Sequence, residues 1–411
     1  MNIWLVIILL ILIVNYFIEL IVSVLNLKSM DEELPAEFSQ VFDKQEYAKS
    51  QNYLRVTTGF SLIKNSTNLF VTIAFILAGG FNYADLLARS FGYSSSIITG
   101  LIFTGILTLF SFLAGLPFSI YSTFVIEENF GFNRTTVKTF CLDIIKGALL
   151  AVIIGGPLLA IILCFFESTG KYSWLYCWLM VVLFSFVLQF LAPVLIMPLF
   201  NKFTPLEDGE LKDRITSYAR KENFAIQGIF TMDGSKRSSK LNAFFTGFGK
   251  FRKIVFFDTL IEKLSVDEIV AVLAHEMGHF KLKHIYKMMA ASILQTGIMF
   301  YLLSLVLNNQ GIFEAFGMEN VSVYASLTFF GFIYSPVNFF ISIIFKKISR
   351  KHEYEADRYA ASTSKMPEKL ISSLKVLSKA NLTNLRPHPF HVFLHHSHPP
   401  VLERIEALRK L

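Results

Sequence analysis

Seven long apolar stretches divide the chain, and each has the length of a helix that crosses a membrane. The first, from Ile3 to Leu27, contains one acidic residue, Glu19. A run of about 20 apolar residues matches the hydrocarbon thickness of a bilayer. The other stretches lie at residues 66–84, 96–120, 147–166, 174–199, 288–309 and 322–345. The pattern predicts a mainly α-helical, polytopic membrane protein with about seven transmembrane helices.

The first stretch is expected to remain in the mature protein. It lacks the basic front end and the small-residue cleavage site of a secretory signal. Glu19 lies inside this span, where an ionisable group is by default functional or faces inward, and the sequence names no partner for it.

Basic residues occur almost entirely in alternate connections between the spans. The segments after spans one, three, five and seven hold 36 of the 38 Lys and Arg residues. The positive-inside rule places the amino terminus outside and the carboxyl terminus in the cytosol. Two of these segments, 200–287 and 346–411, are large enough to fold a polar unit, and both belong to the cytosolic side.

The chain is therefore expected to have four parts. Residues 1–199 form a membrane region with spans one to five, and 200–287 form a cytosolic catalytic loop. Residues 288–345 form spans six and seven, and 346–411 form a cytosolic C-terminal catalytic segment. The length and the lack of a retrieval signal favour a bacterial cytoplasmic membrane; in a eukaryote the endoplasmic reticulum membrane is expected.

Composition supports this assignment and excludes other classes. Apolar residues make up 53% of the chain and charged residues 17%. The net charge of +7 follows from membrane topology, and no basic run is interleaved with aromatic residues as a nucleic-acid surface would require. The cysteines, Cys141, Cys164 and Cys177, show no paired spacing, which argues against a disulfide framework and a thiolate metal site.

A metal-binding motif lies in the stretch from Ser265 to His284. Ser265 and Glu268 have the spacing of a capping box, and an apolar run then leads into His275-Glu276-Met277-Gly278-His279. On a helix, His275 and His279 project from one face about one turn apart. Two such imidazoles can hold one Zn²⁺, while Glu276 reaches a water molecule at the same centre.

A third ligand is expected from the segment that follows span seven. Glu353 and Asp357 are four residues apart and face the same way on a helix, whereas Glu355 is expected to point away. One of the pair can bind zinc while the other hydrogen-bonds a ligating imidazole. A solvated charged helix is the alternative for this segment taken alone.

The pattern H-E-x-G-H before a pair of spans, followed by E-x-x-x-D-x-x-A, resembles the type I family of CAAX prenyl proteases along essentially the whole chain. Members of that family are membrane zinc metalloendopeptidases that remove the last three residues of prenylated C-terminal motifs. The resemblance implies a gluzincin-like unit of helices and a small β-sheet, with one Zn²⁺ per chain. It implies zinc ligands at His275, His279 and Glu353, a general base at Glu276, and a supporting acid, sometimes assigned as a proton donor, at Asp357.

Two further segments share this resemblance. Residues 242–247, with Asn242, Ala243 and Phe244, are similar to the edge strand that aligns the substrate backbone, and residues 251–257 are expected to form a neighbouring strand. A simple hairpin turn is the alternative. The segment 397–405 resembles the His-Pro-Pro segment of the family, which implies that His398 and Arg404 lie near zinc and stabilise an oxyanion.

Other functions remain possible on the sequence alone. One is a general quality-control zinc protease of the HtpX type, and another is a site-2-type intramembrane protease. A third is a non-catalytic transporter or zinc-binding scaffold, which would not need Glu276. The expected partners are the lipid bilayer and a peptide or prenylated peptide, with no nucleic acid and no obligatory protein partner. His284 and the histidines between 388 and 396 are expected to have surface or packing roles.

Overall fold

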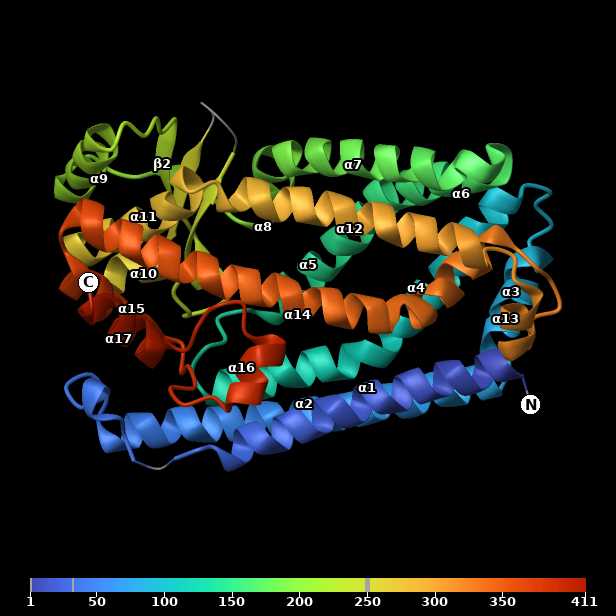
Figure 1. Cartoon of the computed structure of the whole chain (residues 1–411), viewed down its shortest axis with the longest axis horizontal. Coiled ribbons are helices and arrows are strands. Elements are labelled where there is room, and N and C mark those ends of the chain that lie inside the picture. Colours follow the sequence, from blue (N-terminus) through green and yellow to red (C-terminus); the bar gives the residue numbers. More distant parts are fainter. Residues whose placement is uncertain (1, 32, 248–251) are drawn as a thin grey trace.

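The computed structural model describes residues 2–31, 33–247 and 252–411. Within these residues, seven helical segments are long and apolar enough to cross a membrane, which confirms the expected number. They extend along the length of the molecule (Figure 1). They comprise α1 (Ile3–Lys28), α2 (Lys44–Leu77), α4 (Ser96–Tyr121) with the π-helical turn η2 (Ser122–Glu127), α5 (Val137–Leu150) with η3 (Ala151–Gly155) and α6 (Gly156–Ser168), η4 (Gly170–Tyr172) with α7 (Ser173–Leu191), η5 (Ala192–Ile196) and α8 (Met197–Phe200), α12 (His284–Val306), and α14 (Val323–Ser364).

The second membrane helix differs most from its expected bounds. α2 begins at Lys44 and ends at Leu77, whereas the apolar pattern predicted a span at 66–84. Gly79 then has a φ of +71°, a left-handed conformation that commonly ends a helix. The next residues form α3 (Gly80–Ser90) instead of continuing α2. Hydropathy does not detect this end because the residues that follow Leu77 are still apolar.

Short helices and a sheet gather mainly at the two ends of the bundle (Figure 1). At one end, α9, α10, α11, α15 and α17 lie together with the sheet; we refer to these helices and the sheet as the end unit. The amino terminus, α3 and α13 lie at the other end. The bounds are η1 (Ala36–Phe38), α9 (Glu210–Lys221), η6 (Gly234–Lys236), α10 (Asp258–Lys263), α11 (Val266–Lys281), α13 (Gln310–Ala315), α15 (Pro367–Ala380), α16 (Pro389–His395) and α17 (Val401–Arg409).

The sheet of the end unit has four strands in the described residues, in the order β1-β2-β4-β3. The strands are β1 (Phe203–Pro205), β2 (Gly228–Met232), β3 (Ala243–Thr246) and β4 (Lys253–Phe257). β2 and β4 are parallel, and the other two pairs are antiparallel. β3 lies at the edge of the sheet, as predicted for this segment. The neighbouring strand begins at Lys253, and Phe251 lies outside the described residues.

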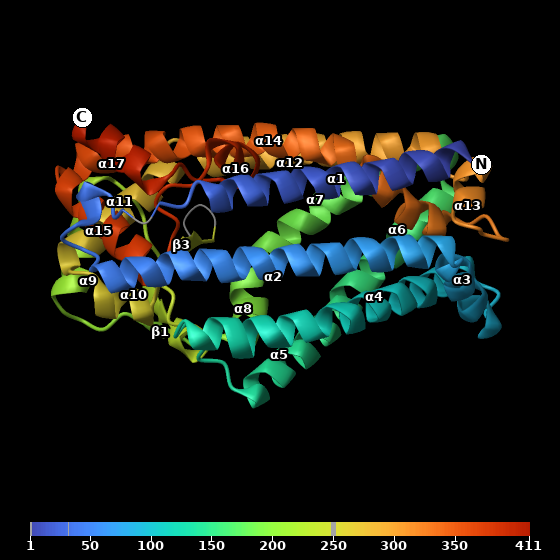
Figure 2. The same ribbon diagram turned by 90° about the horizontal axis from the view of Figure 1, so that it is seen from below.

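The end unit has a continuous hydrophobic core to which the beginning of the chain also contributes. Phe38, Phe42 and Tyr47 are buried in this core together with residues of α9, α10, α11, α15, α17 and β4. These three residues come from the segment after α1 and the first turn of α2. Seen from below, α1 and α2 extend from the end with the amino terminus to the end unit (Figure 2). The segments after spans one, five and seven therefore meet at one end of the molecule.

α14 joins the membrane bundle to the end unit without interruption. It has 42 residues, so at 1.5 Å per residue it is about 63 Å long. That is roughly twice the hydrocarbon thickness of a bilayer, about 30 Å. The expected span at 322–345 and the charged helix after it are thus one helix, whose second half reaches the end unit and packs against α11.

Candidate metal centre and active site

α11 carries the His-Glu-x-x-His motif and begins at the predicted capping box. The backbone N–H of Ser265 donates to Oε2 of Glu268 at 2.7 Å, and the Ser265 hydroxyl donates to the same oxygen at 2.8 Å. Ser372 of α15 donates to the other carboxylate oxygen. Burial disfavours the charged form of Glu268, but these hydrogen bonds lower its pKa overall. The start of α11 is thus attached to α15 by a hydrogen bond.

α11 and α14 approach each other closely at Gly278, the glycine within the motif. A Cβ atom at this position would lie 3.1 Å from Cα and from the carbonyl oxygen of Ala356, and 3.2 Å from Cβ of Tyr359. These distances are shorter than ordinary van der Waals contact. The absence of a side chain at Gly278 therefore allows the backbone of α14 to lie directly against α11.

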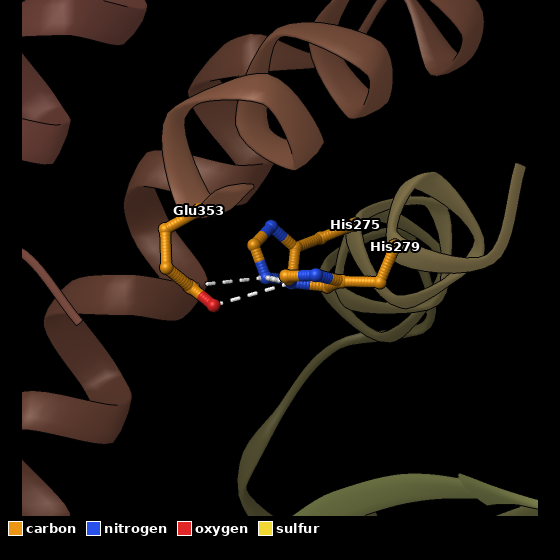
Figure 3. Close-up of side chains that lie close together, drawn as sticks. All are labelled: His275, His279 and Glu353. Atoms are coloured by element: carbon orange, nitrogen blue, oxygen red, sulfur yellow. Dashed lines mark hydrogen bonds and ion pairs between the residues drawn. The ribbon is translucent and has the colours of Figure 1, made fainter. Parts of the chain in front are cut away.

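Three potential metal ligands converge across this contact. His275 and His279 project from α11 toward the carboxylate of Glu353 on α14 (Figure 3). The Nε2 atoms of the two imidazoles are 3.2 Å apart. Oε1 of Glu353 lies 3.2 Å from Nε2 of His279, and Oε2 lies 3.4 Å from Nε2 of His275. His275 is 7% exposed and Glu353 3% exposed, so water does not surround this group.

The arrangement of these atoms fits a bound cation. Nδ1 of His275 lies 2.8 Å from Oδ1 of Asp357, so a proton on Nδ1 leaves the lone pair on Nε2. Oε2 of Glu353 is buried and has no hydrogen-bond partner among the described residues. Nitrogen lone pairs and carboxylate oxygens at such distances repel one another unless a proton or a metal cation lies between them. Two imidazoles and one carboxylate are also the donor set of a His₂Glu catalytic zinc site.

Asp357 is held in place behind His275 by Arg404 of α17. The guanidinium donates from Nε to Oδ2 of Asp357 at 2.8 Å and from Nη2 to Oδ1 at 2.6 Å, which is a bidentate pair. Nη1 of Arg404 also lies 3.3 Å from Oε2 of Glu353. Although burial disfavours the imidazolium, the neighbouring carboxylates of Asp357 and Glu353 raise the pKa of His275 to about 9.

His398 is more accessible than the converging ligands. The His398 side chain is 64% exposed, and its Nε2 lies 3.3 Å from Oε1 of Glu353. Nδ1 of His398 lies 2.9 Å from the hydroxyl of Ser397. Donation by this hydroxyl would leave the His398 proton on Nε2, the atom that faces the site. Glu276 is partly exposed.

Two cavities meet at Glu276, which lines both of them. The larger, about 820 Å³, lies between α7, α12 and α14 and includes Phe244 and Phe245 of β3 in its wall. The smaller, about 130 Å³, contains Asn242, Ala243, His398 and Arg404 together with aliphatic side chains of α10, α11 and α15. Successive residues of β3 therefore extend from one cavity to the other past Glu276.

β3 has polar backbone groups that do not pair with β4. The backbone N–H of Phe257 donates to the carbonyl of Asn242 at 3.1 Å. Because hydrogen-bonded pairs alternate along antiparallel strands, Phe244 and Thr246 also pair with β4, whereas Ala243 and Phe245 direct their N–H and C=O groups to the open edge. The N–H of Ala243 donates to Oδ1 of its neighbour Asn242 at 2.9 Å. The Asn242 side chain thus occupies a position where another chain could pair.

His284 is not on the surface; of the two roles expected of it, surface or packing, it has a packed position, where its ring stacks on that of His352. It is 2% exposed, and its Nδ1 lies 3.1 Å from Nδ1 of His279. Glu355, expected to point away from the ligands, lies 2.9 Å from Nε2 of His284. On one continuous helix, residues five apart would not face each other, so the sequence did not predict this contact. Lys283, with a φ of +59°, separates α11 from α12 and allows the contact to form.

Glu19 of α1 has a partner that the sequence did not indicate. Its Oε2 lies 3.3 Å from Nε2 of His395 on α16. The rings of His391 and His396 lie beside each other nearby, 5.2 Å between centroids. α16 packs against both α1 and α14, so this short helix connects the first membrane helix to the helix that carries Glu353.

Comparison with known proteins gives matches along nearly the whole chain. Residues 23–202 match the family described as CAAX prenyl protease N-terminal, five membrane helices, and residues 205–411 match peptidase family M48. CAAX prenyl protease 1 of Saccharomyces cerevisiae is 38% identical, with 93% of this chain and 89% of that protein aligned. The human CAAX prenyl protease 1 homolog is 34% identical, with 92% and 89% aligned.

A solved structure has the same fold. The crystal structure of S. mikatae Ste24p superposes with a TM-score of 0.94 at 35% sequence identity. The superposition covers 98% of this chain and 99% of that one. Both the membrane helices and the end unit are therefore shared.

Proposed function

The chain belongs to peptidase family M48, as a membrane-embedded member with the CAAX prenyl protease N-terminal region, and from this premise we propose that it removes the C-terminal tripeptide of prenylated CAAX peptides. The observation that carries the proposal is the convergence of His275, His279 and Glu353 beside Glu276, where two cavities meet. A metallopeptidase needs these ligands, a base and space for a peptide on both sides of the scissile bond.

We propose that His275, His279 and Glu353 hold one Zn²⁺ per chain. When bound, zinc supplies Lewis-acid chemistry that lowers the pKa of water and polarises a carbonyl group. The buried Oε2 of Glu353 without a hydrogen-bond partner and the facing Nε2 atoms support this assignment. The M48 family membership supports a metal in general.

Glu276 is the proposed general base. It lines both cavities, so its carboxylate can reach a water molecule that attacks the scissile carbonyl. The same carboxyl group then returns the proton to the leaving amine, and the C–N bond breaks to yield a carboxylate and a free amine. A residue that only supported the fold would not need access to both cavities.

His398 is the proposed donor to the oxyanion of the tetrahedral intermediate. Its exposed ring faces the site, and Ser397 favours a proton on its Nε2. Arg404 lines the same small cavity, but Asp357 engages two of its nitrogen atoms. We therefore assign Arg404 and Asp357 chiefly to positioning: Arg404 holds Asp357, and Asp357 fixes the tautomer of His275.

The substrate backbone is proposed to pair with the open edge of β3 by β-strand addition. Ala243 and Phe245 present the backbone groups that do not pair with β4, and the Asn242 amide must leave the N–H of Ala243 when a substrate carbonyl binds there. This geometry would hold the peptide extended past Glu276. Asn242 then remains at the edge as a second polar contact.

The two cavities suggest how a prenylated peptide would lie. The larger has the apolar side chains of Phe186, Phe244, Met288 and Met289 in its wall and has the volume for a long hydrocarbon group. The smaller is lined by Val272, Leu370 and other aliphatic residues, which suits an aliphatic side chain on the leaving tripeptide. We assign the prenylated cysteine to the larger cavity and the following residue to the smaller.

We propose that the end unit faces the cytosol and the amino terminus lies outside. The distribution of Lys and Arg carries this orientation. The relatives named above come from eukaryotes, which favours the endoplasmic reticulum membrane over a bacterial one. We propose that residues 1–199 and 288–345 form the membrane region and that 200–287 and 346–411 form the catalytic unit. Phe38, Phe42 and Tyr47 also belong to the catalytic unit, because they lie in its core.

The test is hydrolysis of a farnesylated CAAX peptide by the purified full-length protein. We expect the protein to release the tripeptide. This activity should be lost after treatment with a zinc chelator and should return after zinc is added. A matched peptide without the farnesyl group should be cleaved poorly. Equal cleavage of both peptides would indicate a general zinc protease, and zinc-independent or absent cleavage of both would refute the proposal.

A further inference from the structure

Each of the two histidines of the motif contacts a different partner through its Nδ1 atom. His275 reaches a carboxylate directly, because Asp357 lies 2.8 Å away. His279 instead reaches His284, at 3.1 Å between the two Nδ1 atoms, and His284 reaches Glu355 at 2.9 Å. Three helices, α11, α12 and α14, supply this second chain of contacts.

The positions of the protons along this series of contacts, from His279 through His284 to Glu355, follow from the metal site. An imidazole that binds a metal through Nε2 keeps its proton on Nδ1. His279 must then donate from Nδ1, and Nδ1 of His284 must accept. The remaining proton of neutral His284 is on Nε2, where it is donated to Oε2 of Glu355. In this one arrangement, each donor atom that joins His279, His284 and Glu355 faces an acceptor.

We propose that His284 and Glu355 are positioning residues that fix the tautomer and ring orientation of His279 for zinc binding, an inference that rests on the zinc site of the proposed function. His284 and Glu355 together do for His279 what Asp357 does for His275, with one additional imidazole between the ligand and the carboxylate. Such partners of a ligating histidine raise its basicity and restrict its rotation, and their removal typically weakens metal binding about 10- to 100-fold.

The same residues admit a rival interpretation, a second metal site. His284, His352 and Glu355 have ligand atoms within 4.8 Å of one another. However, the rings of His284 and His352 are stacked, 3.9 Å between centroids and 6° between planes. A metal ion lies near the plane of each imidazole that binds it, and two parallel stacked rings cannot share such a position. Nε2 of His284 would also have to lose the proton that it donates to Glu355.

The fold favours a permanent contact over an accidental one. His284 is the first residue of α12, directly after the left-handed turn at Lys283, and the His352 ring covers its face. His284 is 2% exposed, whereas the Glu355 side chain is 34% exposed. Glu355 can therefore be replaced with little effect on the core, which makes it the safer position for a test.

The experiment measures zinc affinity by competition with a chelator in the full-length protein, together with zinc stoichiometry. We expect His284→Phe to weaken zinc binding about 10- to 100-fold and Glu355→Ala to weaken it less. His284→Asn keeps an acceptor near the position of Nδ1 and should recover part of the affinity. Glu406→Ala, which removes an exposed carboxylate paired with Lys410, is the matched control and should bind like the wild type.

A second measurement separates positioning from folding and from the rival site. In Co²⁺-substituted protein, the visible absorption bands should shift in Glu355→Ala but not in Glu406→Ala, while both keep the unfolding temperature of the wild-type metal-free protein. Wild-type zinc affinity and spectrum in both His284→Phe and Glu355→Ala would overturn the inference. So would two zinc ions per chain with one lost in His352→Phe. A wild-type protein that bound no zinc would refute the proposed function itself, and the inference with it.

Discussion

Gly278 of α11 lies against Ala356 of α14 so closely that a Cβ atom on Gly278 would be 3.1 Å from the Ala356 backbone. His275 and His279 lie on either side of this glycine in sequence, and Glu353 lies one turn before Ala356. The contact therefore brings the two imidazoles close to the carboxylate. Gly278 thus has a structural reason to be glycine, apart from any need for an unusual backbone angle.

Replacing Gly278 with Ala should move α14 away from α11 by a few tenths of an ångström. We expect a loss of about 1–3 kcal/mol in the free energy of unfolding, as for other overpacked cores, together with weaker zinc binding. Gly147→Ala is the matched control, because a Cβ at this glycine of α5 would meet no atom of the described residues within 4 Å, apart from its chain neighbours and the backbone of its own helix. Thermal unfolding and zinc competition measure the two effects. A Gly278→Ala variant that binds zinc like Gly147→Ala would show that the contact does not control the ligand geometry.

Replacing Glu276 with Gln should separate metal binding from hydrolysis. Glu276 is not among the three converging ligands, so zinc stoichiometry should remain that of the wild type. Without the base, kcat should fall at least about 10²- to 10⁴-fold. Zinc content and tripeptide release are measured on the same sample. Undiminished hydrolysis would remove Glu276 from the mechanism, and unchanged biological activity would favour the scaffold or transporter alternative.

Zinc affinity should increase with pH up to about 9. In the metal-free protein the pKa of His275 is raised to about 9 by Asp357 and Glu353, against the effect of burial. Below this pH, His275 carries an extra proton that must leave before the imidazole can bind zinc, so affinity should change by up to about tenfold per pH unit. Above pH 9 the dependence on His275 ends.

The sign of this effect can be checked directly. Zinc added to the metal-free protein in weak buffer at pH 7.5 should release the His275 proton, and zinc added above pH 9.5 should release less. The same raised pKa stabilises the metal-free fold at low pH, and this contribution is lost as the pH rises through 9. Glu276→Gln retains all three ligands and should show the same dependence of proton release on pH. Proton release that does not depend on pH would contradict the assignment.

Replacing Ala243 with Pro should weaken substrate binding while leaving the sheet intact. The N–H of Ala243 points to the open edge of β3, so its loss removes no hydrogen bond to β4, and proline is tolerated at an edge. One lost hydrogen bond corresponds to roughly 0.5–1.5 kcal/mol, which is up to about tenfold in kcat/KM. Ala243→Ser keeps the N–H and is the control. If Ala243→Pro has the kinetics of Ala243→Ser, the substrate does not pair with this edge.

Local patterns determined much of this protein from the sequence. The seven apolar spans could be counted because a membrane helix depends on the hydropathy of its own residues. The spacing of His275 and His279 and the capping box at Ser265 are also properties of a single helix. The edge position of β3 was expected from the family resemblance, and the structure agrees.

Contacts between elements were decided by the tertiary structure. α2 ends at Leu77 because of the backbone angle at Gly79, while the apolar pattern continues past it. Glu19 meets His395 only because α16 packs against α1. His284 reaches His279 only because the left-handed turn at Lys283 starts α12 in a new direction. The helical period describes neighbours on one helix, and it cannot describe a residue beyond a turn whose dihedral angles the sequence does not reveal. The sequence by itself thus determined the number of spans and the metal-binding motif, and the packing of α11, α12 and α14 decided what surrounds that motif.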